Sequence, residues 1–189
     1  MSLAAVWLWM YLAWVALEIA ISIGMRSRSD RANVQDRGSQ LGLWLVIVLS
    51  FTASGFLRHH DLAPMHMAWT WLTPVCIALF AMGLVVRIAA ILTLGKWFTA
   101  NVATQAGQTI QRRGLYGVVR HPSYLGMEIL FFAIGLFSND WLCLALSFVP
   151  PTLAVLYRIH VEEAALLTAF GPEYADYART TRRLVPKIY

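Results

Sequence analysis

Two segments of this otherwise apolar chain carry side chains that could do acid–base or anion-binding chemistry. In the first segment, Arg158 and Glu162 are four residues apart and share one face of a helix, whereas Glu163 points to another side. An arginine can hold a carboxylate through two parallel hydrogen bonds, and a glutamate can accept a proton from an attacking group. The alternative is an exposed ion pair that contributes little to stability.

The second segment covers residues 120–124, which read RHPSY. Pro122 suits the first turn of a helix, where its missing N–H costs nothing. His121 and Tyr124 would then share a face, and the free N–H groups of that turn could bind a carboxylate. For His121, the alternative is an ordinary residue at the membrane interface.

The stretch before this helix, residues 94–121, is rich in glycine and has basic but no acidic residues. Glycines let the backbone approach a ligand closely, and the basic character suits an anionic or carboxylate-bearing ligand. The alternative is a solvated loop held near anionic lipid by its arginines and lysine.

Three further ionisable residues, Glu18, Arg87 and Glu128, lie inside apolar segments. Each stands six or seven residues from the same end of its segment, which places all three about 9–10 Å below one membrane surface. Because an unpaired buried charge is very costly, we expect Arg87 to pair with Glu18 or Glu128. We interpret the three residues as substrate-binding candidates; the alternative is an ion pair that only holds helices together.

The composition predicts the kind of element that positions these groups. Apolar residues make up 59% of the 189 residues and charged residues 13%, against about 25% charged in soluble domains. The mean hydropathy is +0.60. These values exclude a disordered chain, a nucleic-acid-binding module and an ordinary soluble enzyme, and they indicate one membrane-embedded domain that covers residues 1–189.

We predict an all-α integral membrane protein with five transmembrane helices. The last two form a tight hairpin, because only Ser138, Asn139 and Asp140 separate them. The fourth span is short and reaches only about 24 Å. The expected spans are 3–25, 41–57, 69–94, 122–137 and 141–159.

The basic residues predict the orientation of these spans. Thirteen of the fifteen lysines and arginines flank one side of the membrane, while Arg58 stands alone on the other and Arg87 lies within a span. The positive-inside rule therefore places the N-terminus outside and the C-terminus, with the 95–121 loop, in the cytoplasm.

The residues after the last span predict an amphipathic C-terminal segment. Its apolar and aromatic stripe comprises Ala164, Leu167, Phe170, Tyr174 and Tyr177. We expect the stripe to pack at the membrane interface, as aromatic anchors do. Two isolated cysteines, Cys76 and Cys143, suggest neither a disulfide framework nor a metal site, so no metal is an expected partner. The composition gives no reason to expect a nucleic-acid partner either.

Several of these motifs, in this order and spacing, resemble the isoprenylcysteine carboxyl methyltransferase family. The resemblance runs from about residue 94 to 186. The shared elements are Leu94-Gly95, Gly114-Leu115-Tyr116, the RHPSYLG run at 120–126, Arg158 with Glu162-Glu163 and Leu166, Phe170-Gly171 with Glu173-Tyr174 and Tyr177, and Pro186. This small version looks most like the prokaryotic branch of the family, which implies a bacterial or archaeal inner membrane.

The resemblance implies a methyltransferase that uses S-adenosylmethionine on the cytoplasmic side. Residues 1–93 would supply three N-terminal spans and residues 94–189 the cofactor-binding half. Arg158 and Glu162 would lie near the reacting methyl group as catalytic residues. The acceptor would be a lipophilic or lipidated substrate that enters from the membrane lipids, with a carboxylate, thiol or amine as nucleophile. The implied cofactor-binding residues are Tyr116, Val118, Val119, Arg120, His121, Tyr124 and Glu163.

Two alternatives from other classes stay open. A membrane reductase of the sterol-reductase type shares a related His-Pro-x-Tyr helix start and uses NADPH. It would place an acidic residue directly after the Tyr-x-Gly step, where this chain has Met127. The second alternative is a non-catalytic membrane protein of the same fold.

Overall fold

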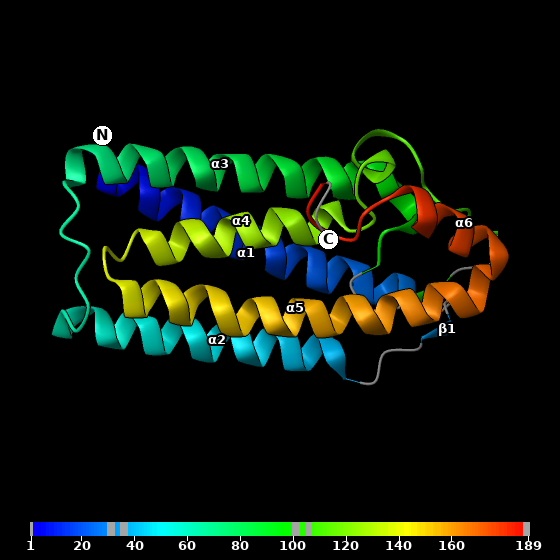
Figure 1. The fold of residues 1–189 in the computed structure, drawn as a ribbon, viewed down its shortest axis with the longest axis horizontal. Coiled ribbons are helices and arrows are strands. Elements are labelled where there is room, and N and C mark those ends of the chain that lie inside the picture. Colours follow the sequence, from blue (N-terminus) through cyan, green and yellow to red (C-terminus); the bar gives the residue numbers. More distant parts are fainter. Residues whose placement is uncertain (1, 30–32, 35–37, 100–102, 105–106, 187–189) are drawn as a thin grey trace.

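The computed structural model of the chain describes residues 2–29, 33–34, 38–99, 103–104 and 107–186, which form a bundle of long helices (Figure 1). The helices are α1 (Leu3–Ser29), α2 (Ser39–Leu57), α3 (Trp69–Leu94), α4 (Pro122–Leu136), α5 (Trp141–Phe170) and α6 (Pro172–Thr180). Two short strands, β1 (Asn33–Val34) and β2 (Ala103–Thr104), pair antiparallel. Single 3₁₀ turns occur at η1 (Arg58–His60), η2 (Gly95–Trp97) and η3 (Gly114–Gly117).

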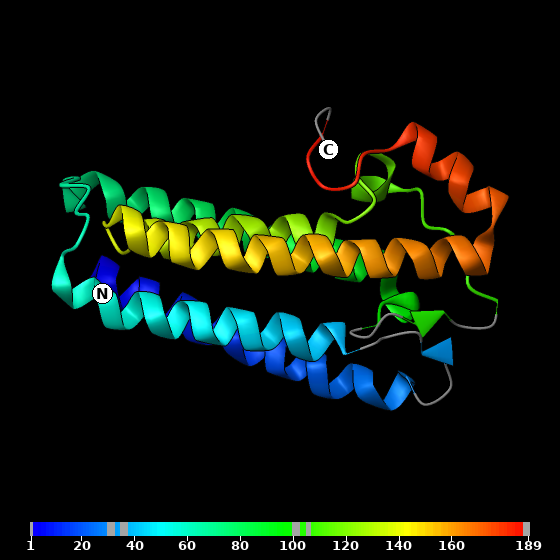
Figure 2. The same cartoon turned by 60° about the horizontal axis from the view of Figure 1, so that its bottom comes forward.

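Four of the described helices, α1, α2, α3 and α5, are long and apolar enough to cross a membrane. The fifth, α4, is apolar but has only 15 residues, which reach about 22 Å. The views agree that α4 lies within the bundle, packed between α3 and α5, with α2 on the far side of α5 (Figures 1 and 2). The predicted all-α membrane fold is confirmed, with α5 extending eleven residues beyond the expected span end at Ile159, to Phe170.

The α4–α5 hairpin is confirmed, and a network of hydrogen bonds fixes its turn. Asn139 adopts a left-handed backbone conformation, with φ of 57°, which asparagine tolerates better than most residues. The Asp140 carboxylate accepts from the backbone N–H of Cys143 at the start of α5 and from that of Ala63 in the α2–α3 loop. We call this end of the bundle, residues 58–68 and 137–140, the hairpin end.

Helices α3 and α4 cross in direct backbone contact. A Cβ atom added to Gly126 would lie 2.7 Å from the Arg87 nitrogen and 2.8 Å from the Gly83 carbonyl oxygen. Such distances are shorter than real Cβ contacts, so only glycine permits this crossing. The crossing places the backbone of Arg87 directly against α4.

The opposite end of the bundle, residues 95–121 and 171–186, is called the pocket end. Here the C-terminal segment lies beside the RHPSY segment, because the backbone N–H groups of Arg120 and His121 donate to the carbonyls of Arg182 and Arg183. Residues 95–121 form only short turns and strand β2 in their described parts. This agrees with the glycine-rich, polar character of the stretch.

The amphipathic C-terminal segment is confirmed as α6, but the expected interfacial packing is wrong for the two tyrosines of its stripe. Ala164, Leu167 and Phe170 belong to the continuous helix α5. Tyr174 and Tyr177 of α6 are both buried against the protein. The expectation failed because Gly171, with φ of 52°, turns α6 back over the bundle.

Candidate active site

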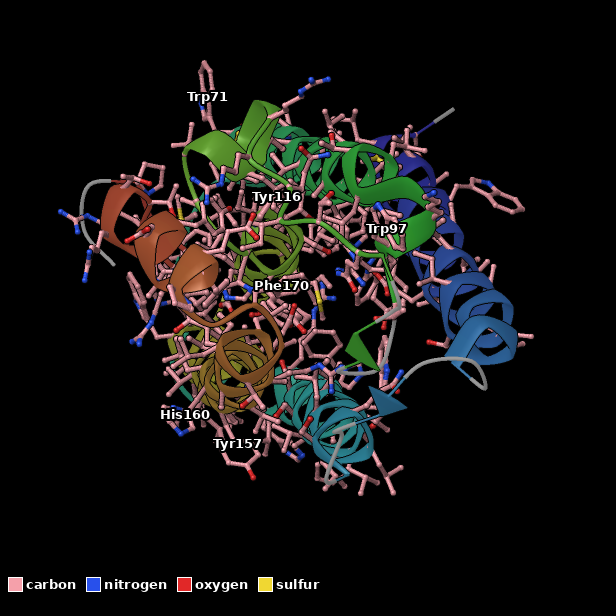
Figure 3. The ribbon with its side chains drawn as sticks, turned by 90° about the vertical axis from the view of Figure 1, so that its right-hand side faces the viewer. Trp71, Trp97, Tyr116, Tyr157, His160 and Phe170 are labelled. Carbon is pink, nitrogen blue, oxygen red and sulfur yellow. The ribbon has the colours of Figure 1, made fainter. Side chains whose placement is uncertain are left out.

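A large pocket opens at the pocket end and receives residues from all five long helices. It contains about 1290 Å³ of space outside the protein atoms, including its open mouth. Figure 3 looks onto this end, where Trp97, Tyr116 and Phe170 lie around the middle of the view, whereas Tyr157 and His160 of α5 lie at its edge. The pocket is therefore built by the long helices and roofed by the 95–121 loop and α6.

The Tyr124 hydroxyl joins the two predicted catalytic residues. Arg158 donates from Nε to Tyr124 Oη over 2.9 Å, and Tyr124 Oη donates to Glu162 Oε2 over 2.9 Å. Arg158 also donates from a terminal nitrogen to Ser39 Oγ over 2.8 Å. All of these side chains except Ser39 line the pocket. The sequence placed Arg158 and Glu162 on one helix face; the structure links them through a tyrosine of another helix.

Glu163 lies on a different side of α5, as its position predicts, and gathers three basic side chains. Its Oε1 accepts from Arg120 Nε at 2.8 Å, and its Oε2 accepts from Arg183 Nε at 2.8 Å. His121 Nε2 lies 3.4 Å from Oε1. Arg120 also donates to the carbonyls of Ala178 and Thr181. Glu163 thus ties the C-terminal segment to α5 and to the start of α4.

His121 lies between two carboxylates. Its Nδ1 is 3.9 Å from Glu162 Oε1, and its Nε2 is 3.4 Å from Glu163 Oε1. The ring is buried and packs beside Tyr124, with 5.8 Å between the ring centroids. The predicted shared face of His121 and Tyr124 is therefore present, and both side chains line the pocket.

The tyrosines that roof the pocket stay protonated. Burial, and then the nearby Glu162 carboxylate, raise the pKa of Tyr116 above its usual range. Burial raises the pKa of Tyr177 to about 12 and that of Tyr174 still further. Tyr177 Oη donates to the Tyr116 carbonyl over 2.6 Å. At neutral pH these side chains are hydrogen-bond donors and carry no charge.

The remaining predicted cofactor residues, Val118 and Val119, differ in exposure. Val119 is buried, whereas Val118 is 53% exposed, and neither lines the pocket. The Val118 carbonyl accepts from the Arg182 backbone N–H at 3.4 Å. Val118 therefore joins the C-terminal segment to the loop through its backbone, whereas the Val119 N–H donates to the Leu115 carbonyl within the loop.

Of the two partners that the sequence offered for Arg87, the structure selects Glu18. Arg87 donates from Nε and from a terminal nitrogen to the two Glu18 oxygens, so the pair is bidentate. The other terminal nitrogen donates to Ser123 Oγ over 2.7 Å. Trp14 Nε1 donates to Glu18 over 3.1 Å. Glu18, Arg87 and Ser123 all line the pocket.

Glu128 lies apart from this ion pair. It faces α5, where its Oε2 is 2.6 Å from the Thr152 hydroxyl, and it does not line the pocket. Its Oε1 is buried without a hydrogen-bond partner among the described residues. Of the three charged residues predicted at one depth in the membrane, only Glu18 and Arg87 pair with each other. Glu128 points to Thr152 of α5 and stays apart.

Sequence reasoning missed several residues that line the pocket or hold its side chains in place. Ser39 and Ser123 are small polar residues whose partners lie 119 and 36 positions away, and no local pattern signals such contacts. Tyr174 and Tyr177 belong to the motifs shared with the family, but neither is among the predicted site residues. Trp97 and Phe98, which also line the pocket, are aromatic residues in a polar loop, and this contrast could have marked them.

The sequence and the fold of the chain are similar to those of named methyltransferases. Residues 76–168 match the isoprenylcysteine carboxyl methyltransferase (ICMT) family. A relative from Oryza sativa subsp. indica, named "Probable protein-S-isoprenylcysteine O-methyltransferase", is 30% identical over 165 residues, which are 84% of each protein. Methanethiol S-methyltransferase 2 of Bradyrhizobium diazoefficiens is 34% identical over 97 residues, 51% of this chain.

A solved structure supports the same relationship. The eukaryotic intramembrane Ras methyltransferase ICMT superposes with a TM-score of 0.65 at 26% identity, over 77% of this chain. The chain spans 52% of that solved chain and 36% of the Bradyrhizobium protein. Both relatives are therefore longer proteins, and the solved one shares the helical fold.

The fold defines a predominantly helical integral membrane protein with a large pocket at one end of its bundle. The chain belongs to the isoprenylcysteine carboxyl methyltransferase family, as its motifs indicated. The comparisons do not favour the reductase alternative.

Proposed function

We propose that the protein transfers a methyl group from S-adenosylmethionine to a lipophilic acceptor in the membrane. One observation carries the proposal. The Tyr124 hydroxyl joins Arg158 and Glu162 in a pocket, so three residues of the family's motifs meet where a ligand can reach them. Membership of a methyltransferase family supports the same reaction.

The residues of the pocket fit the proposed cofactor. Tyr174 Oη is buried without a partner among the described residues, although its side chain lines the pocket, so a polar ligand atom suits this position. Arg120 and Glu162 could bind the carboxylate and the cationic groups of such a ligand. When bound, S-adenosylmethionine supplies an electrophilic methyl group on a sulfonium. Residues 94–189, with Tyr116, His121 and Tyr124 among them, would form the cofactor-binding half.

A carboxylate is the acceptor that we favour. It is already ionised at neutral pH and needs no base, so the protein has only to orient and desolvate it, and orientation supplies most of the rate gain. Arg158, which Tyr124 and Ser39 hold in place, is suited to orient such a group. The name of the Oryza relative specifies an isoprenylcysteine O-methyltransferase, which supports this acceptor class.

A thiol is the second candidate acceptor. Its pKa of about 8.5 means that a base increases the reactive fraction at neutral pH. The Glu162 side chain is 31% exposed and lines the pocket, so it is placed to accept that proton. The name of the Bradyrhizobium relative, a methanethiol S-methyltransferase, supports this alternative.

Binding of three ligands to the purified protein in detergent tests the cofactor. We expect S-adenosylmethionine and S-adenosylhomocysteine to bind with micromolar Kd in calorimetry, and NADPH not to bind. Binding of NADPH alone would contradict the proposal and support a reductase. Transfer of labelled methyl groups to a prenylcysteine analogue and to a long-chain alkyl thiol then distinguishes the two acceptor classes.

A further inference from the structure

We propose that the Glu18–Arg87 ion pair holds α1 in place as one wall of the acceptor-binding part of the pocket. Both residues then act as positioning residues for acceptor binding. This inference rests on the methyl transfer proposed above. The acceptor wall consists of pocket residues from the first three long helices, which are Ile21 and Ser22 of α1, Leu43 and Trp44 of α2, and Leu94 of α3.

Helix α1 is held tightly at the hairpin end by aromatic packing. Trp7 stacks on Phe137, with ring centroids 4.1 Å apart, and meets the edge of Phe80 at 5.3 Å. Trp14 meets Phe80 edge-on at 6.2 Å and Phe51 at 6.4 Å. Such aromatic contacts add to the large apolar area that these rings bury. Aromatic packing therefore holds this half of α1 without an ion pair.

Beyond Trp14, the support for α1 changes. Residues 15–29 contain no aromatic side chain, so the ring contacts that hold the first half of α1 do not continue into the second half. The Glu18–Arg87 pair is a buried, bidentate connection between this part of α1 and α3. Ile21 and Ser22, the next α1 residues to line the pocket, follow within one turn. The position of this wall therefore depends on Glu18.

Arg87 is a rigid anchor for this contact. Its backbone touches Gly126 of α4, and its guanidinium contacts Ser123 at the first turn of the same helix. The Arg87 side chain, which belongs to α3, thus contacts both α1 and α4. Because Ser123 adjoins Tyr124, the anchor also connects α1 to the residue that holds Arg158 and Glu162.

Because burial of two charges is costly, we infer that the Glu18–Arg87 pair contributes more to the position of α1 than to the stability of the fold. The side chains of Arg87 and Glu18 are only 6% and 4% exposed. Well-packed apolar residues in place of a buried ion pair are often neutral or stabilising, whereas removal of one partner alone is strongly destabilising. An apolar double variant can therefore keep the fold and lose only the fixed geometry.

The test uses Glu18→Leu/Arg87→Leu in the full-length protein, with Arg87→Lys as a milder variant that keeps the charge but cannot form the fork. We expect the double variant to raise the acceptor KM about tenfold, because a wall displaced by about 1 Å misaligns bound groups. The Kd of S-adenosylhomocysteine should stay within about twofold, since the pair lies outside the cofactor motifs. Arg87→Lys should raise KM less.

A second measurement does not depend on catalysis. Ser22→Cys introduces a thiol on the acceptor wall, while the native Cys76 and Cys143 are buried. We expect N-ethylmaleimide to label Ser22→Cys several-fold faster when the ion pair is replaced. Ser147→Ala is the control. It removes a buried hydroxyl that has no described partner and does not line the pocket, and it should change neither the KM nor the labelling rate.

The possible outcomes separate this inference from the proposed function. Unchanged labelling together with unchanged acceptor KM would show that the pair only holds the fold and would overturn the inference. Loss of S-adenosylhomocysteine binding in a folded double variant would overturn it as well, because the pair would then serve the cofactor. If the native protein methylates no acceptor, the proposed function fails, while the labelling rate still decides whether the pair fixes α1.

Discussion

At the scale of single residues, the Tyr124 hydroxyl is the centre of the candidate site. It accepts a hydrogen bond from Arg158 and donates one to Glu162. A phenol can do both at once, because its oxygen has one proton and free lone pairs. The hydroxyl therefore fixes the relative position of a cation and an anion that stand one helical turn apart on α5.

Tyr124→Phe should lower kcat about tenfold to a hundredfold, because Arg158 and Glu162 lose their common partner and a small misplacement is costly. The Kd of S-adenosylhomocysteine should change much less. Methyl-transfer kinetics and calorimetry on the same preparation measure the two effects. Tyr157→Phe, an exposed tyrosine one position before Arg158, serves as control, and equal losses in both variants would contradict the role of Tyr124.

Glu162→Gln should distinguish the acceptor classes. Transfer to a thiol should fall about a hundredfold, because a general base contributes two to four powers of ten, whereas transfer to a carboxylate should fall far less. The measurement compares initial rates with matched acceptors at neutral pH. Unchanged rates with both acceptors would remove Glu162 from the chemistry.

At the scale of the elements, two local features fix how the helices meet. Glycines at the α3–α4 crossing allow the backbones to touch, which places Arg87 beside Ser123. At the other end, Asp140 caps α5 and also binds the loop before α3. The crossing and the cap together hold the short helix α4 in its position between two longer ones.

Gly126→Ala should destabilise the protein by about 1–3 kcal/mol, because the added methyl group meets backbone atoms that cannot move aside. Thermal unfolding in detergent measures the effect. Gly55→Ala in α2 is the matched control, since a Cβ there meets nothing within 4 Å. A Gly126→Ala variant as stable as this control would contradict the close crossing.

The Asp140 cap should make stability depend on pH. Burial alone would raise the pKa of Asp140, but hydrogen bonds from the backbone N–H groups of Cys143 and Ala63 outweigh it and hold the pKa below its usual range. A depressed carboxyl pKa contributes stability above the unfolded-state value of about 4, and this stability is lost as pH falls through the folded-state pKa.

We therefore expect the Tm of the native protein to fall between about pH 5 and pH 3. The Tm of Asp140→Asn should fall less over the same range. At neutral pH, Asp140→Ala should be less stable by about 1 kcal/mol, the usual cost of a lost helix cap. Melting curves at several pH values measure both effects. Parallel pH dependence in the native and Asp140→Asn proteins would contradict the assignment.

At the scale of the whole molecule, the pocket end and the hairpin end differ in charge. The pocket end contains seven of the fifteen lysines and arginines, whereas the hairpin end contains one, Arg58. At the hairpin end, Arg58 lies over the rings of Trp69 and Phe137, at 6.0 and 5.4 Å from their centroids. The positive-inside rule predicts that the pocket opens to the cytoplasm.

Cysteine labelling in intact cells tests this orientation. A membrane-impermeant maleimide should label His60→Cys at the hairpin end from outside, and label Arg179→Cys on α6 only after lysis. Both positions are exposed in the structure. Labelling of Arg179→Cys in intact cells would place the pocket on the outer side and contradict the prediction.

The amino-acid sequence alone predicted the apolar spans and the motifs of the pocket end. Hydrophobic runs report helix length because a helix in lipid must satisfy its own backbone hydrogen bonds. The span from Trp69 to Leu94 was predicted with the bounds that the structure shows. The motifs Arg120 to Gly126 and Arg158 to Glu163 likewise indicated the family, because their spacing is local.

Only the tertiary structure decided which of these groups meet. The partner of Arg87 depends on how α1 and α4 are rotated about α3, and this rotation follows from the Gly83–Gly126 crossing and from aromatic packing. Likewise, Ser39 reaches Arg158 across 119 residues, and Gly171 turns Tyr174 and Tyr177 inward. Such contacts depend on the packing of distant segments, which no local spacing encodes.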